Sequence, residues 1–175
     1  MTIRFTLVFR MLIMALVALP LSAWGALAAE RALAFAVSGV VVEVKVSTGD
    51  QVEAGQPLAV LDTRPFAARK RAADAAVKAT RVVLDLTNLR LSQVKELFDA
   101  LSASAEQVDN AKTAQAQATQ AYESAKAEAE IAAWQLERAT LSAPFKGTVS
   151  AVPGYVGQVV DLNAQVSPVV TLNQP

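Results

Sequence analysis

Side chains that could do chemistry in this chain are limited to carboxylates, hydroxyls, lysines and arginines, because its 175 residues include no histidine and no cysteine. This excludes disulfides, thiol chemistry, imidazole acid–base catalysis and zinc sites with the usual ligands. The carboxylates lie mostly along stretches with a helical pattern, and no Gly-rich phosphate loop or nucleophile–base set is found. We therefore expect no enzyme, no cofactor and no metal site.

The composition indicates an elongated protein that does not bind nucleic acid. Apolar residues make up 53% of the chain, but many of them are alanine, and only 6% are aromatic, so few bulky side chains can fill a core. The 16 basic and 16 acidic residues balance, and without the N-terminal Arg4 and Arg10 the remainder is slightly acidic. A nucleic-acid-binding domain would carry a basic patch instead.

The N-terminus has the pattern of an export signal. Arg4 and Arg10 are followed by a long apolar run, and the small residues around Ala28 suit cleavage before Ala29 or Glu30. The run is also long enough to span a bilayer, so an uncleaved membrane anchor remains open. Residues 1–29 are therefore predicted to be a signal peptide or anchor, and the rest of the chain is expected outside the cytoplasm.

Two short β segments are predicted at the two ends of the remaining chain. In the first, valines alternate through "GVVVEVKV", and turns follow at Gly49 and Gly55. The second is "TLSAPFKGTVSAVPGYVGQVV". At an offset of 108 residues, Gly39 aligns with Gly147 and Gly49 with Gly157. We interpret the segments as an imperfect internal repeat whose halves pair into one small sandwich, with two unrelated hairpins as the alternative.

Between these segments lie two predicted helices. After Pro65 no glycine or proline occurs until the second β segment, and Pro65 suits the first turn of a helix. The one break is near Ser104, which with Gln107 three residues later forms the capping-box pattern. The sequence therefore predicts helices over about 65–100 and 105–139, each about 50 Å long.

Heptad patterns predict that the helices form an antiparallel coiled-coil hairpin. Apolar residues of the first helix spread beyond one stripe, which fits either a second face for another subunit or a broad seam. Charges predict cross-helix pairs of Lys78 with Glu128 and of Arg81 with Glu123. The predicted seam of the second helix is Val108, Ala111, Gln115, Ala118, Tyr122, Ala125, Ala129, Ala132, Leu136 and Ala139. The two series of the first helix are Val77, Leu84, Leu91 and Phe98, and Ala73, Thr80, Thr87, Val94 and Leu101.

The segments "GVVVEVKVSTGDQVEAGQPLAVLD" and "LERATLSAPFKGTVS", with the helical region between them, resemble the periplasmic adaptor or membrane fusion proteins (HlyD-like) of tripartite efflux pumps and type I secretion systems. The resemblance implies an α+β fold, a split biotinyl-lipoyl-like β-sandwich interrupted by a long antiparallel helical hairpin. The implied domains are residues 30–63 and 141–175 for the two β halves and 64–140 for the hairpin, with its turn near 101–104. The expected structural turn residues are Gly39, Gly49, Gly55, Pro144, Gly147 and Gly157.

The resemblance also implies the partners and the localisation. These are an inner-membrane transporter of RND or ABC type, a TolC-like outer-membrane channel, and further copies of the chain in a ring, which is a hexamer in better-known family members. The expected place is the periplasm, in association with the inner membrane. The competing interpretations are a structural periplasmic coiled-coil protein and a lipoyl or biotin carrier. The carrier is disfavoured because no modifiable-lysine tripeptide such as MKM or DKA occurs.

Adaptors of this family carry a hairpin-tip motif, Arg-x3-Leu-x6-Ser, often with an aspartate five positions further on. Leu97, Ser104 and Asp109 match this spacing, but the arginine position holds Gln93, and Arg90 lies about one helical turn earlier. Gln93, Leu97, Ser104 and Asp109 are thus the candidate partner contacts. Ser104 is equally explained as a helix N-cap, and Leu97 as hairpin core.

The family usually continues beyond the second β half into a β-barrel domain and a membrane-proximal domain. The sequence in hand stops at Pro175, where the barrel would begin. A truncated product, one piece of a split adaptor and a compact protein are all compatible with this end.

Overall fold

The structure is a computed structural model that describes residues 30–164 and 167–174. The predicted signal peptide or anchor, residues 1–29, lies outside the described residues. Within the described ranges, no helix is both long enough and apolar enough to cross a membrane.

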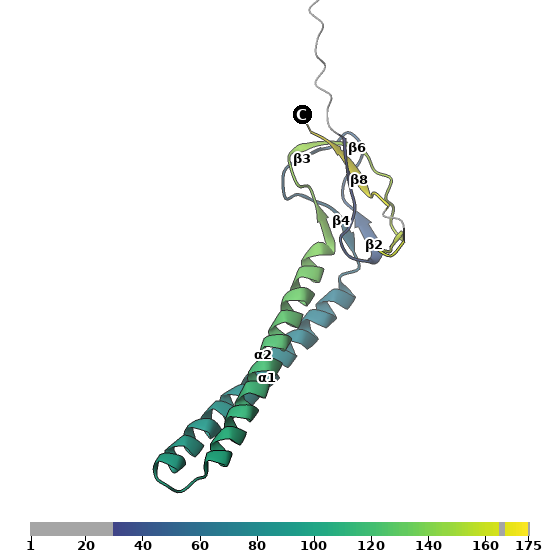
Figure 1. The fold of residues 1–175 in the computed structure, drawn as a ribbon. Helices are drawn as coiled ribbons and strands as arrows, with labels where there is room; N and C mark the ends of the chain where they lie inside the picture. The colour runs from purple at the N-terminus through teal and green to yellow at the C-terminus, as the bar shows by residue number, and fades with distance from the viewer. Residues whose placement is uncertain (1–29, 165–166, 175) are drawn as a thin grey trace, which may run out of the picture.

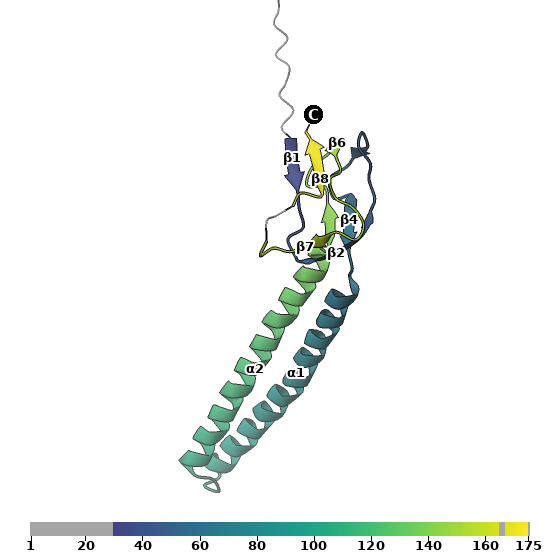
Figure 2. The same cartoon turned by 90° about the vertical axis from the view of Figure 1, so that its right-hand side faces the viewer.

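The chain forms a small β domain from which one helical hairpin projects (Figures 1 and 2). Strands β1 and β8, where the described chain begins and ends, lie at the end of the β domain away from the hairpin (Figure 2). The elements before the turn are β1 (Glu30–Leu33), β2 (Gly39–Val44), β3 (Gln51–Val52), β4 (Pro57–Leu61) and α1 (Arg64–Asp99). Those after it are α2 (Ala105–Arg138), β5 (Thr140–Ser142), β6 (Gly147–Ala151), β7 (Val159–Val160) and β8 (Val170–Asn173).

The β domain consists of two four-stranded sheets, each built from both halves of the chain. One sheet has the order β1-β8-β6-β3 and the other β5-β4-β2-β7. Strand β3 of the first half pairs with β6 of the second half, and β7 of the second half pairs with β2 of the first. Neither half forms a complete sheet from its own strands, so the two segments separated by the hairpin must fold together.

The pairing of β3 and β7 with strands of the other half follows the internal repeat. Val52 pairs with Gly147, and at the offset of 108 residues Gly39 pairs with Val160. The interlocking hydrogen bonds are repeated as well. The Gly49 amide donates to the Val149 carbonyl over 2.8 Å, and the Gly157 amide donates to the Val41 carbonyl over 2.8 Å. The predicted repeat of two pairing halves is therefore confirmed, and two unrelated hairpins are excluded.

The hydrophobic core lies between the sheets and extends to the roots of both helices. Phe66 at the start of α1 and Ala139 just after α2 belong to it. Since α1 buries no other side chain, Phe66 is its anchor to the β domain. The largest fully buried side chains are Leu58, Leu61, Leu172, Val41, Val52, Val149, Val169 and Val170.

Helix α1 begins with a salt bridge between its first residue, Arg64, and Asp62, the residue that follows β4. The Thr63 side chain makes no capping hydrogen bond, and Asp62 does so instead, because its Oδ1 accepts from the Arg64 amide at 3.0 Å. The Arg64 guanidinium also binds this carboxylate, with Nη2 at 2.7 Å from Oδ2. These contacts with Arg64 lower the pKa of Asp62 to about 2, so the carboxylate is charged at neutral pH.

The coiled-coil seam of α2 agrees with the predicted heptad. Its buried residues, Val108, Ala111, Ala118, Ala125 and Ala132, are all members of the predicted series. In α1 the two predicted series are half-buried, apart from their last members, Phe98 and Leu101, which are exposed. The five apolar residues that would have broadened the seam are exposed, so the broad seam within one hairpin is wrong. These residues are Val82, Val83, Leu86, Leu89 and Leu97.

The predicted cross-helix ion pairs are absent from the described residues. Arg81 Nε instead binds Oδ1 of Asp85, one turn along the same helix, at 2.9 Å, and its guanidinium lies 5.6 Å from the centre of the Tyr122 ring. Tyr122 is the sequence neighbour of the predicted partner Glu123. An i,i+4 carboxylate on the same helix is within easy reach of the arginine and competes for it.

Candidate functional site

Helix α1 ends in a Schellman motif that holds Leu101 in an unusual conformation. The Leu101 amide donates to the Phe98 carbonyl at 2.9 Å, and the Ser102 amide donates to the Leu97 carbonyl at 2.7 Å. Leu101 has φ 59°, in the left-handed region, where glycine is the usual residue. This conformation costs an L-residue with a Cβ roughly 1–2 kcal/mol. The Leu101 side chain is nevertheless 93% exposed.

Ser104 starts α2 through the predicted capping box. Its Oγ accepts from the Gln107 amide at 3.2 Å, and the Gln107 side chain accepts from the Ser104 amide at 2.8 Å. The hydroxyl is therefore already engaged in the helix start.

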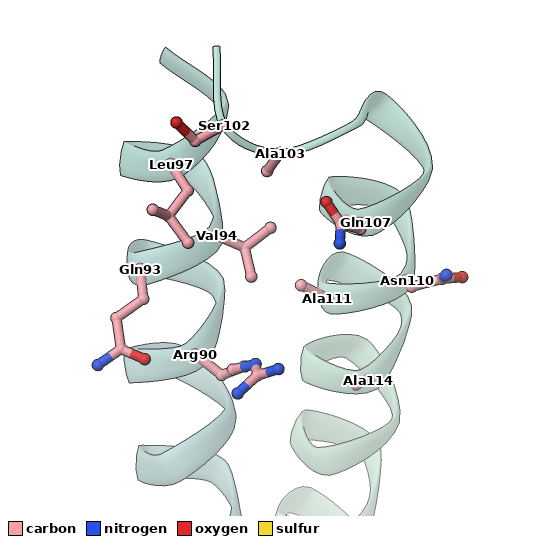
Figure 3. A pocket seen from close by; sticks show the side chains of 10 residues that line it. All are labelled: Arg90, Gln93, Val94, Leu97, Ser102, Ala103, Gln107, Asn110, Ala111 and Ala114. Carbon is pink, nitrogen blue, oxygen red and sulfur yellow. The ribbon is translucent and has the colours of Figure 1, made fainter. Parts of the chain in front are cut away.

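A groove of about 450 Å³ lies between the helices just below the turn (Figure 3). Two of the predicted contact residues, Gln93 and Leu97, line it together with Arg90. In Figure 3 the Arg90 side chain reaches toward α2, whereas Gln93 points away from it. Arg90 thus supplies a guanidinium to the groove from one turn below the motif position. The complete lining is Arg90, Gln93, Val94, Leu97, Ser102, Ala103, Gln107, Asn110, Ala111 and Ala114.

The other two predicted residues do not line the groove. Ser104 is exposed next to it, and Asp109 is exposed on α2, where its Oδ1 binds Nζ of Lys112 at 3.0 Å. The four candidates are therefore all at the hairpin tip, but only Gln93 and Leu97 share one surface. Their role as partner contacts remains a prediction.

The sequence analysis assigned Leu101 both to the end of a heptad series and to the turn near 101–104. The structure has its turn there and places Leu101 in it, exposed to solvent and outside the seam. The seam ends because α1 itself ends at Asp99. The usable signal was a leucine between the end of one helix and the cap of the next, where Gly or Asn is usual.

The surroundings of the tip are acidic. Residues 95–112 contain two lysines and four carboxylates, a net charge of −2, and all six side chains are exposed. Within the described residues, their only salt bridge is the one between Lys112 and Asp109. An exposed leucine therefore lies among mostly negative side chains.

A second exposed apolar surface lies on the β domain. The internal repeat gives each of its residues an equivalent in the other half, with which it can be compared. Val40 of β2 pairs with Val159 of β7, which is 72% exposed. We call the set Val40, Val42, Tyr155, Val156 and Val159 the apolar β surface; all five are exposed. Their equivalents in the other half are the polar residues Thr148, Ser150, Ser47, Thr48 and Gln51. The fold therefore does not require apolar side chains at these positions.

The turn residues expected in the β domain have distinct surroundings. Gly49, Gly55 and Gly157 have positive φ values. Gly39 and Gly147 lie at equivalent strand starts, where Gly147 is packed against the Asn173 carbonyl. Pro144 is exposed in the link between β5 and β6. Among the described residues, no cluster of acidic side chains could hold a metal ion.

Comparison with known proteins places this arrangement in a family. Residues 30–171 match the family model described as CzcB-like, barrel-sandwich hybrid domain. The sequence has no significant match among curated proteins.

Solved structures of similar fold include three adaptor-type proteins. A MacA–MexA chimeric protein containing the Pseudomonas aeruginosa MexA α-hairpin domain is 26% identical, with a TM-score of 0.63, over 83% of this chain and 46% of that one. The membrane fusion protein Spr0693 from Streptococcus pneumoniae R6 is 24% identical, with a TM-score of 0.65, over 83% and 59%. ZneB from Cupriavidus metallidurans is 19% identical, with a TM-score of 0.58, over 82% and 60%. This chain thus spans less than two thirds of each.

Proposed function

Because the chain belongs to the family of CzcB-like barrel-sandwich hybrid domains, we propose that it is the adaptor subunit of a transmembrane efflux or secretion system. The observation that carries the proposal is the hairpin inserted into the split β domain. Its helices of 36 and 34 residues extend the tip about 50 Å from that domain. A chain of this shape suits the role of a spacer between two partners. In the proposed role its own residues catalyse no reaction.

The proposal assigns a task to each part of the chain. Residues 30–63 and 141–175 form the β domain that packs into a ring near the inner-membrane transporter, of RND or ABC type. Residues 64–140 form the hairpin, whose tip, with Gln93, Leu97, Ser104 and Asp109, meets a TolC-like outer-membrane channel. Residues 1–29 export the chain to the periplasm or anchor it in the inner membrane.

A partner at the tip is tested by photo-cross-linking in cells of the source organism. A benzophenone amino acid at Ser102 is expected to cross-link to an outer-membrane protein, and purification of the tagged chain from membranes is expected to recover an inner-membrane transporter. The matched control is the same amino acid at Gln117, exposed on the shaft of α2. Recovery of neither membrane partner would contradict the adaptor function and favour a structural coiled-coil protein.

The apolar β surface supports the proposed ring and gives a second test. The triple variant Tyr155→Ser, Val156→Thr, Val159→Gln gives the second half the residues of the first. Burying one apolar side chain is worth about 1.5–3 kcal/mol, and about 1.4 kcal/mol changes affinity tenfold. We therefore expect self-association to weaken at least tenfold by light scattering, while the melting temperature stays within a few degrees, since the other half already folds with these residues.

The control for this swap alters the equivalent polar positions. Replacing Ser47, Thr48 and Gln51 with alanine is expected to leave the self-association unchanged, as judged by the molar mass of the assembly in light scattering. A wild-type protein that is monomeric at high concentration, or a swap that leaves the oligomer intact, would exclude the apolar β surface as the contact between subunits.

A further inference from the structure

Leu101 combines two unfavourable features in one residue. Its backbone adopts a left-handed conformation that glycine or asparagine would adopt more easily, and its apolar side chain is 93% exposed. The Schellman hydrogen bonds that fix this conformation use only backbone groups of Phe98, Leu97 and the two turn residues. A polar residue would therefore serve the turn equally well, so the fold itself does not account for a leucine.

The charges around Leu101 restrict what could cover it. Asp99 and Glu106, both exposed, flank the turn from the end of α1 and the start of α2, and residues 95–112 together have a net charge of −2. The tip of a second copy would carry the same negative charge, and an anionic lipid surface would also repel it. A basic protein surface is attracted to it, and charge complementarity of this kind mainly sets specificity and association rate.

We propose that Leu101 is the specificity-determining contact of the hairpin tip, and that it inserts into an apolar pocket bordered by lysine or arginine on the partner protein. This inference rests on the proposed function, which places a protein partner at the tip. It adds a residue outside the set Gln93, Leu97, Ser104 and Asp109, and it defines the chemistry of the partner surface. Asp99 and Glu106 are expected to pair with the basic border.

The test compares partner capture with stability in the full-length chain. Leu101→Gly and Leu101→Asn are expected to reduce the yield of the outer-membrane partner captured at the tip at least tenfold, without lowering the melting temperature. Glycine and asparagine both tolerate a positive φ, so the turn should still fold in these variants, and a loss of capture would then report the loss of the side-chain contact. The matched control is Leu86→Asn on the exposed shaft of α1, which is expected to leave capture unchanged. The charge-reversal variant Asp99→Lys with Glu106→Lys is expected to reduce capture at least threefold.

Several results would overturn the inference. Equal capture by wild type and both Leu101 variants would overturn this inference and leave the proposed function standing. A lower melting temperature of both variants would also overturn it, because Leu101 would then be needed for folding. Leu101-dependent binding to vesicles of phosphatidylethanolamine and phosphatidylglycerol would assign the tip to a lipid surface. Because the chain has no cysteine, a Ser102→Cys variant reports contact between two tips as a disulfide-linked dimer, and that dimer would also overturn it. If wild type captures no membrane partner, the proposed function fails as well.

Discussion

Replacing Gly147 with alanine is expected to lower the free energy of unfolding by about 1–3 kcal/mol, the usual cost of inserting atoms where there is no room. A Cβ at Gly147 would lie 2.5 Å from the carbonyl oxygen of Asn173. That oxygen belongs to β8, which pairs with β6 and β1, so relief requires a shift of the central strands of one sheet. Urea unfolding followed by circular dichroism measures the loss.

The internal repeat provides the matched control, Gly39→Ala, at the equivalent position of the other half. There a Cβ would lie 3.2 Å from Cδ1 of Leu61, so the atom that has to shift, by a few tenths of an ångström, belongs to a side chain and not to the backbone. A loss of less than about 1 kcal/mol is expected. Equal losses for the two variants would show that backbone crowding at Gly147 is not the cause.

The variant Phe66→Ala is expected to have the largest effect, a loss of about 3–5 kcal/mol, the range for deleting a buried aromatic side chain. Phe66 is 5% exposed, belongs to the core of the β domain and is the only residue that α1 buries. Removing it would therefore open a cavity and also release the root of the hairpin. Chemical denaturation gives the loss, and hydrogen exchange of the first turns of α1 should rise more than that of the turns near the tip.

The control uses the same residue type at the other end of the same helix. Phe98 is 42% exposed near the tip, so Phe98→Ala is expected to change stability by at most about 0.5 kcal/mol. If Phe66→Ala were as mild, the hairpin would not be held by its root in the core.

Periodic features made most of the fold predictable from the sequence. The heptads gave the seam, the pattern at Ser104 and Gln107 gave the start of α2, and the glycines at an offset of 108 residues gave the pairing of the two β halves. Each of these signals arises from local backbone geometry or from a repeated fold unit. Such signals can be read from residue spacing without knowing the tertiary structure.

Features that depend on tertiary contacts or on competing partners were not predictable. Arg81 forms its salt bridge with Asp85 on the same helix, and the pattern of opposite charges across the hairpin could not predict this partner. Gly154 was missed because its constraint comes from Val169, against which an added Cβ would clash. Leu101 was expected in the turn near 101–104 and also continued a heptad series, and neither pattern distinguished it from its neighbours. Exposure and backbone conformation, which identify it, appear only in the folded chain.

The way the hairpin joins the β domain also bears on how the molecule carries mechanical load. Strand β4 leads into α1 and α2 leads into β5, and these two strands are hydrogen-bonded neighbours in one sheet. A pull on the tip therefore acts on both strands at the same end, and it does not separate them from each other. The tension passes from β4 to β2, and from β2 to β7 of the other half, so the exchanged strands resist it together. A partner that pulls on the tip would therefore load all four strands of this sheet at once and would not peel away a single strand.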